Sequence, residues 1–272
     1  MTMLAARNLS VRLAGAKILD TVDFVAAAGE VTAIIGPNGS GKTTLLRALS
    51  GELPVAGDVA LNGSDIRNLK PWQAAALRAV LPQATVLAFP FTVREVVRLG
   101  LAAGGAGVPS AMLERLPEVA LERVDLAGFA GRMYQDLSGG EQQRVQLARV
   151  LCQVWTPVLD GVPCWLLLDE PVSSLDIRHQ LLVMNIARDF ADAGGGVVAV
   201  LHDLNLASLF ADRVVVMDRG KVAANGTAAA VLVDDVLARV FGCDLRVGML
   251  PAPGIPFVLP HAALSQNPIG RS

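Results

Sequence analysis

The residues best suited to do chemistry form a glycine-rich segment at positions 36–43. It reads Gly-Pro-Asn-Gly-Ser-Gly-Lys-Thr, fits the pattern G-x-x-x-x-G-K-[S/T], and lies between a strand-like apolar run and a helix-like one. Glycines let backbone N–H groups converge on phosphate oxygens, and the start of the following helix adds unsatisfied N–H donors and a positive dipole end. The segment predicts a nucleoside triphosphate cradle of Gly36, Pro37, Asn38, Gly39, Ser40, Gly41, Lys42, Thr43 and Thr44.

Within this cradle, Lys42 is predicted to neutralise the β and γ phosphates, and the Thr43 hydroxyl to bind Mg²⁺. Two carboxylates then end a second apolar run, 165–168. The C-terminal ends of strands are where open α/β sheets place their ligands. Asp169 is therefore predicted to hold the Mg²⁺ shell, and Glu170 to orient or deprotonate the attacking water. The plain alternative is a solvated acidic turn after a strand, and a kinase, a GTPase and a motor all remain open at this point.

A third segment, Asp-Leu-Ser-Gly-Gly-Glu at 136–141, precedes a helical run. Its serine can cap that helix, and its glycine amides can approach a phosphate closely, so it is a second anion site on the same chain. The segment resembles the signature of ABC transporter nucleotide-binding subunits. That resemblance implies that Ser138, Gly139, Gly140 and Glu141 serve the ATP of a partner copy, so that a homodimer encloses two nucleotides about a two-fold axis.

The remaining motifs of this family follow in order, and the resemblance covers roughly residues 4–242. It implies that Gln83 contacts both Mg²⁺ and the attacking water, that Asp176 lies in a loop crossing the dimer seam, and that His202 lies near the γ-phosphate. The cofactors implied are ATP and Mg²⁺, with Thr43, Gln83 and Asp169 at the metal. Two positions depart from the family: Glu141 replaces a commoner glutamine, without an expected loss of function, and Leu13 stands where an aromatic side chain often stacks on adenine.

Element patterns predict an α/β protein. The first thirty residues alternate between apolar and polar side chains, which predicts an antiparallel sheet region. The patterns predict a buried strand at 31–35 and a helix at 43–49. Two further strands are predicted at 165–168 and 197–201, joined by a helix at 177–193. Such strand–helix–strand order predicts a mostly parallel sheet, with a hairpin at 213–223 near its edge. With the resemblance, the expected fold is a P-loop NTPase (RecA-like) core with an antiparallel β subdomain and an inserted helical subdomain at about 84–155. The expected domain spans 1–244, and a loosely structured tail spans 245–272.

Composition limits the possible partners. A formal net charge of −2 gives no reason to expect nucleic acid as a partner. No apolar run approaches the roughly 20 residues of a spanning helix, and residues 1–7 do not read as a secretory signal, so a cytoplasmic protein is expected. Three cysteines without a CxxC pair predict reduced, mostly buried thiols.

Partner and cargo follow only from resemblance. Residues 77–83 and 88–93, with the long loop before Trp165, look like hemin import ATP-binding proteins of the iron-chelate and cobalamin importer branch. This implies a membrane permease in two copies, a periplasmic substrate-binding protein beyond it, and a place on the cytoplasmic face of the cell inner membrane. The alternatives are ferric siderophore or cobalamin as cargo, a soluble P-loop kinase, and a non-transport ABC ATPase such as a cluster-assembly ATPase. Residues 89–93 form either the permease groove or an internal packing cluster.

Overall fold

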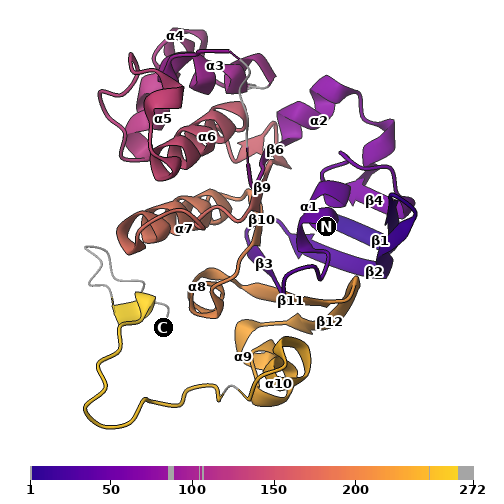
Figure 1. Ribbon diagram of the computed structural model, residues 1–272. Helices are drawn as coiled ribbons and strands as arrows, with labels where there is room; N and C mark the ends of the chain where they lie inside the picture. Colours follow the sequence, from indigo (N-terminus) through magenta and orange to yellow (C-terminus); the bar gives the residue numbers. More distant parts are fainter. Residues whose placement is uncertain (1, 85–88, 104, 106, 245, 263–272) are drawn as a thin grey trace.

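The structure is a computed structural model that describes residues 2–84, 89–103, 105, 107–244 and 246–262 (Figure 1). The strands are β1 (Met3–Leu13), β2 (Ala16–Ala27), β3 (Val31–Ile35), β4 (Ala56–Leu61), β5 (Ser64–Asp65), β6 (Arg78–Leu81), β7 (Val158–Leu159), β8 (Val162–Pro163), β9 (Trp165–Asp169), β10 (Gly196–Val200), β11 (Arg213–Asp218) and β12 (Lys221–Gly226). The α-helices are α1 (Lys42–Leu49), α2 (Pro71–Leu77), α3 (Val93–Ala103), α4 (Ser110–Leu113), α5 (Leu116–Arg123), α6 (Gly139–Gln153), α7 (Ile177–Asp192), α8 (Leu204–Phe210), α9 (Ala228–Val231) and α10 (Asp234–Phe241). Short 3₁₀ turns are η1 (Ile66–Asn68), η2 (Tyr134–Asp136) and η3 (Pro260–Ala262).

A mostly parallel sheet forms the centre, in the order β12-β11-β3-β10-β9-β6, with only β12 antiparallel to its neighbour among the strands described. Strands β3, β9 and β10 are buried along their whole length because elements cover both faces, which explains their unbroken apolar sequences. The predicted parallel sheet and edge hairpin are confirmed. Since β3, β9 and β10 are adjacent and parallel, the segments that follow them emerge at the same edge.

The two faces of this sheet belong to two cores. Along β9, Trp165 and Leu167 face one core and Leu166 and Leu168 face the other, as the two-residue period of a strand requires. Helix α1 and the antiparallel sheet β2-β1-β4-β5 cover the first face. Helices α7 and α8 lie on the opposite face (Figure 1). The predicted antiparallel region is confirmed, although β4 and β5 extend it beyond the first thirty residues.

The helical subdomain is built around α6, which packs against α3 and α5 and also reaches β6 (Figure 1). Its α-helices run from Val93 to Gln153, inside the predicted 84–155, of which residues 85–88, 104 and 106 lie outside the described residues. The loop 154–164 contains the small hairpin β7–β8 rather than only a long connection. Within the described residues, every helix is too short or too polar to cross a lipid bilayer.

The tail has little regular structure over the described residues 246–262 apart from η3, which returns to pack on α8. It begins at a fixed point, because the backbone N–H of Val247 donates to Asp234 at 2.8 Å and Arg246 pairs with the same carboxylate. Of the three cysteines, Cys152 and Cys164 are buried and Cys243 is exposed, and none forms a disulfide. Burial raises the pKa of the Cys152 thiol to about 12 and that of Cys164 to about 11.

Gly196 tests how tightly the central sheet is packed. A Cβ atom there would lie 2.4 Å from the ring of Trp165, which is fully buried and donates its indole N–H to Asn62 at 3.0 Å. Because the ring cannot retreat, Gly196→Ala is expected to lower the free energy of unfolding by about 1–3 kcal/mol. Gly131→Ala is the control, since its Cβ would meet no heavy atom within 4 Å. Urea denaturation measures both, and equal midpoints for the two variants would contradict the packing.

Candidate functional site

The glycine-rich segment 36–43 turns sharply between the end of β3 and the start of α1. At Gly36 the backbone φ is +147°, and a Cβ atom would lie 2.2 Å from the carbonyl oxygen of Met217, so only glycine fits there. Gly41 caps α1 with a left-handed φ of 102°. The Ser40 hydroxyl is buried and has no hydrogen-bond partner among the described residues. The loop thus leads directly into the first turn of α1, and the unsatisfied N–H groups of a helix start suit phosphate.

Lys42 is folded back into this loop. Its ammonium donates to the carbonyl oxygens of Gly36 at 2.9 Å and Pro37 at 3.0 Å, and the residue is 6% exposed. Burial lowers the pKa of Lys42, while the nearby carboxylates of Glu170 and Asp169 act in the opposite direction. A buried ammonium that is only partly compensated binds an incoming anion strongly, because the cost of its desolvation is already met by the fold.

A cavity of about 630 Å³ opens over the loop, and its lining comes from several elements. The lining residues are Ile18, Asn38, Gly39, Gly41, Lys42, Thr43, Thr44, Gln83, Glu170 and His202. The structure therefore gathers six of the nine predicted cradle residues around one space with Gln83, Glu170 and His202, whereas Gly36, Pro37 and Ser40 are not in the lining. Leu13 is not among these residues, and Ile18 on β2 lies at the cavity instead.

Asp169 and Thr43 form an oxygen pair beneath the cavity. The Thr43 hydroxyl donates to the Asp169 carboxylate at 3.0 Å, and Asp169 is 3% exposed. Burial raises the pKa of Asp169, and the Thr43 hydrogen bond only partly opposes this. A buried carboxylate beside a hydroxyl and an open, anion-binding cavity is an oxygen donor set of the kind that Mg²⁺ takes together with substrate phosphates, so the residues fit this ion.

Glu170 is the junction of the site. Its backbone adopts a left-handed φ of 51°, and its N–H donates to the carbonyl of Val200 on the next strand at 3.2 Å. Its carboxylate accepts a hydrogen bond from Gln83 at 2.9 Å and pairs with His202 Nε2 at 2.5 Å. The carboxylate is therefore aimed by two side chains from separate loops, above the buried Asp169.

The start of α8 positions His202. The carboxylate of the next residue, Asp203, accepts hydrogen bonds from the N–H groups of Asn205 at 2.7 Å and Leu206 at 3.2 Å. This N-cap fixes the backbone directly after β10, so the imidazole projects over the cavity with its side chain 43% exposed. An exposed imidazole at a cavity can hydrogen-bond to a bound ligand.

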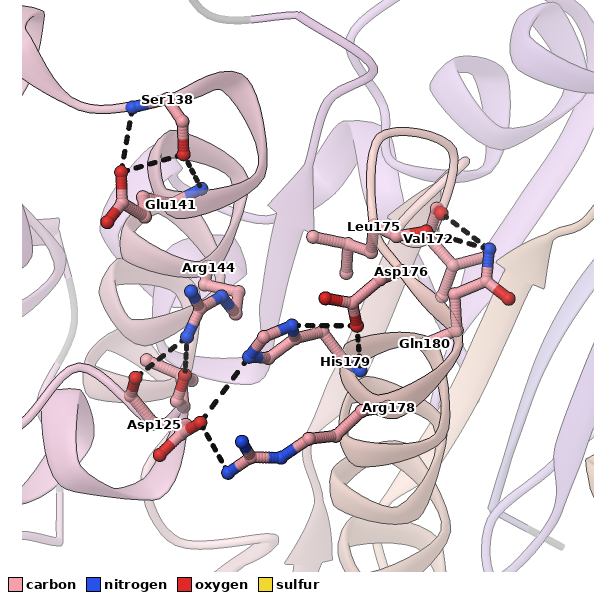
Figure 2. A network of polar contacts seen from close by, with 11 residues as sticks. Asp125, Ser138, Glu141, Arg144, Val172, Leu175, Asp176, Arg178, His179 and Gln180 are labelled. Carbon is pink, nitrogen blue, oxygen red and sulfur yellow. Dashed lines mark hydrogen bonds and ion pairs between the residues drawn. The ribbon is translucent and has the colours of Figure 1, made fainter. Parts of the chain in front are cut away.

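The signature segment lies elsewhere on the surface. Ser138 caps α6 through a reciprocal capping box: its N–H donates to the Glu141 carboxylate at 2.8 Å, and its hydroxyl accepts from the Glu141 N–H at 3.3 Å (Figure 2). The Ser138 hydroxyl also donates to the Glu141 carboxylate at 2.7 Å, and this bond, together with the one from the Ser138 N–H, lowers the pKa of Glu141. Ser138 and Gly139 are exposed, and no residue of 138–141 lines the cavity. Within one chain, residues 138–141 therefore lie apart from the cavity over residues 36–43.

Asp176 also lies away from the cavity. It caps α7 by accepting the N–H of His179 at 2.9 Å, and it does not line the cavity.

The structure adds Gln143 to the residues identified from sequence. Its side-chain amide donates to the backbone carbonyl of Glu170 at 2.9 Å, which ties α6 to the junction. A lone glutamine inside a helix gives no sequence signal of such a contact.

Comparison with known proteins decides the family. Residues 19–173 match the family model described as ABC transporter, which is more than half of the chain. The chain belongs to the ABC transporter family. Membership implies that this ABC ATPase binds ATP.

Relatives cover nearly the whole length of this ABC ATPase. The hemin import ATP-binding protein HmuV of Mesorhizobium japonicum is 64% identical over 96% of this chain and 100% of its own length. That of Rhizobium meliloti is 62% identical over 96% of this chain and 99% of its own length. A solved structure of an ATP-binding subunit of an ABC transporter matches with a TM-score of 0.73 and 26% identity, over 89% of this chain and 95% of that one. Another, the ADP conformation of an ATP-binding cassette of an ABC transporter, matches with a TM-score of 0.73 and 25% identity, over 89% and 98%.

The position of the Glu170 carboxylate between Gln83 and His202 leads to a prediction for Glu170→Gln. The amide keeps the size of the side chain but cannot take a proton, so ATP binding should be unchanged while turnover falls by about 100-fold or more. Glu52→Gln, an exposed carboxylate paired with Arg47, is the control and should keep normal turnover. Steady-state phosphate release and equilibrium binding of ATP measure the two effects. Normal phosphate release by Glu170→Gln would remove Glu170 from the chemistry.

Proposed function

We propose that this chain is the ATP-hydrolysing subunit of a hemin importer. The observation that carries the proposal is the Glu170 carboxylate, held by Gln83 and His202 over the cradle. Full-length similarity to proteins named for hemin import supports the cargo. The reaction is hydrolysis of the terminal phosphoanhydride of ATP by water.

Each residue at the cavity has a proposed role. Lys42 and the N–H groups of residues 38–43 hold the phosphates and their growing charge. Thr43 and Asp169, with Gln83, hold Mg²⁺, which when bound neutralises charge on the phosphate oxygens. Glu170 orients the attacking water and accepts its proton. His202 holds the Glu170 carboxylate in position and faces the γ-phosphate. Gln83 connects the site to the helical subdomain.

We also propose that the working form is a homodimer. Ser138 and Gly139 are exposed at the start of α6, and a Cβ on Gly139 would meet no atom within 4 Å, so an outside phosphate can approach the backbone there. The cavity of the same chain has no signature residue in its lining. In a two-fold dimer, residues 138–141 of each copy cover the ATP held by the other, with Asp176 beside the seam.

The proposed membrane partner is a permease in two copies, with a periplasmic substrate-binding protein beyond it and this subunit on the cytoplasmic face of the inner membrane. Phe89 and Phe91 form an edge-to-face pair with ring centroids 6.3 Å apart. Phe91 packs against the core, whereas Phe89 is 71% exposed. One ring therefore anchors the segment in the helical subdomain and the other offers an apolar contact to the permease. Ala88, before them, lies outside the described residues.

Cargo is tested by growth. In a bacterium that lacks this subunit, hemin should fail as the iron source, while growth on a ferric siderophore and cobalamin-dependent growth should continue. The wild-type subunit should restore growth on hemin, and Glu170→Gln, expressed at the same level, should not. Loss of siderophore or cobalamin use instead would reassign the cargo. Unchanged growth on all three, with no membrane protein copurifying, would favour a non-transport ABC ATPase.

A further inference from the structure

A polar cluster joins the helical subdomain to the first turn of α7 (Figure 2), and none of the residues labelled there lines the nucleotide cavity. On the subdomain side, Asp125 follows α5 in a left-handed backbone conformation, φ 58°. Arg144 of α6 is 7% exposed and donates to the carbonyl oxygens of Val124 at 2.9 Å and Asp125 at 2.7 Å. The turn that carries the Asp125 side chain is thereby fixed to α6, the helix that begins at the signature segment.

On the core side, two consecutive residues of α7 reach the same Asp125 oxygen. Arg178 lies 2.8 Å from it, and His179 Nε2 lies 3.4 Å from it. The other ring nitrogen, Nδ1, lies 2.9 Å from the Asp176 carboxylate. The His179 side chain is 17% exposed, whereas that of Arg178 is 76% exposed. The imidazole therefore bridges the loop 173–176 to the helical subdomain, and it is the better-shielded of the two contacts.

A second contact between the same two bodies lies at the signature itself. A Cβ atom on Gly140 would lie 3.1 Å from the carbonyl oxygen of Ser174. Two separate points of contact restrict the rotation of the helical subdomain relative to α7 more than either point does alone. The Gly140–Ser174 approach and the His179 bridge are the contacts nearest the signature segment, and the Arg123–Asp189 ion pair at 3.9 Å joins α5 to α7 further along the helix.

We propose that His179 is a positioning residue that fixes the loop 173–176 relative to the signature segment within one copy. This rests on the proposed function, in which both segments of one copy face the partner. With the bridge in place, the signature and the loop meet the partner as one rigid surface, and movement of the helical subdomain carries both. Without it, nucleotide still binds to the cradle, but the closed dimer forms with a misaligned surface.

Kinetics of the purified subunit test the proposal. His179→Ala should lower kcat for ATP hydrolysis by about tenfold and leave the KM for ATP within about twofold, because the cradle is untouched. Asp125→Ala should do the same, and the double variant should be no slower than the worse single variant, since one bridge is lost only once. Arg67→Ala, which breaks an exposed ion pair with Asp58 and Asp65 on the antiparallel sheet, is the control and should keep the wild-type kcat.

Conservative replacements separate bridging from helix capping. Asparagine at position 179 can keep a donor near Asp176, and glutamine can keep one near Asp125, but neither side chain spans both carboxylates. Both variants should remain slow if the bridge is what matters. Three results would each overturn the proposal. The first is a wild-type kcat for His179→Asn, and the second is a double variant in which the effects of the two single variants multiply. The third is a raised KM for ATP with an unchanged kcat.

A distance measurement keeps the test independent of catalysis. Spin labels at Glu122 on α5 and Asn185 on α7, both exposed, report the angle between the two bodies in a Cys243→Ser background. The distance distribution of the nucleotide-free chain should broaden in His179→Ala and in Asp125→Ala, and not in Arg67→Ala. An unchanged distribution would overturn the bridge even if the subunit hydrolyses ATP. If the distance distribution broadens as expected in the two variants but the wild-type subunit does not hydrolyse ATP, the proposed function is wrong and the bridge stands.

Discussion

The position of the Glu170 carboxylate is the constraint on which the rest of the site depends. Its backbone is held in a left-handed conformation by the neighbouring strand and by Gln143, and its side chain is aimed by Gln83 and His202. Three separate segments thus converge on one residue: the end of β10 with His202, the loop that carries Gln83, and α6. Each segment holds Glu170 through a hydrogen bond or an ion pair. A displacement of any one segment would therefore break that contact or shift the Glu170 carboxylate.

Local motifs were predictable from sequence because each is contiguous and has one physical purpose. The 36–43 cradle, the strand ending in Asp169 and the capping serine at position 138 all lie where their patterns indicated. What sequence did not reveal depends on contacts between distant segments. Gln143 reaches Glu170 across 27 positions, and Asn62 accepts the Trp165 indole N–H across 103. The short strands β4, β5, β7 and β8 exist through their pairing and carry little periodicity of their own.

Residues 36–43 and residues 138–141 lie apart within one copy, and the proposed function depends on this separation. We propose that the P-loop beneath the open cavity binds ATP in each copy, and that the capped and exposed start of α6 contacts the ATP held by a partner copy. Association of two copies would complete both sites at once, and so would couple nucleotide binding to movement of the helical subdomains. The Glu141 carboxylate is compatible with this arrangement because it is used in capping its own helix.

Disulfide formation between different chains tests this composite site most directly. Chains carrying Asn38→Cys are mixed with chains carrying Ser138→Cys, both in the Glu170→Gln, Cys243→Ser background. A covalent dimer is expected only in the mixture and only with ATP, whereas each chain alone should remain monomeric under denaturing conditions. An intramolecular link in a single chain carrying both cysteines, with no dimer from the mixture, would contradict it.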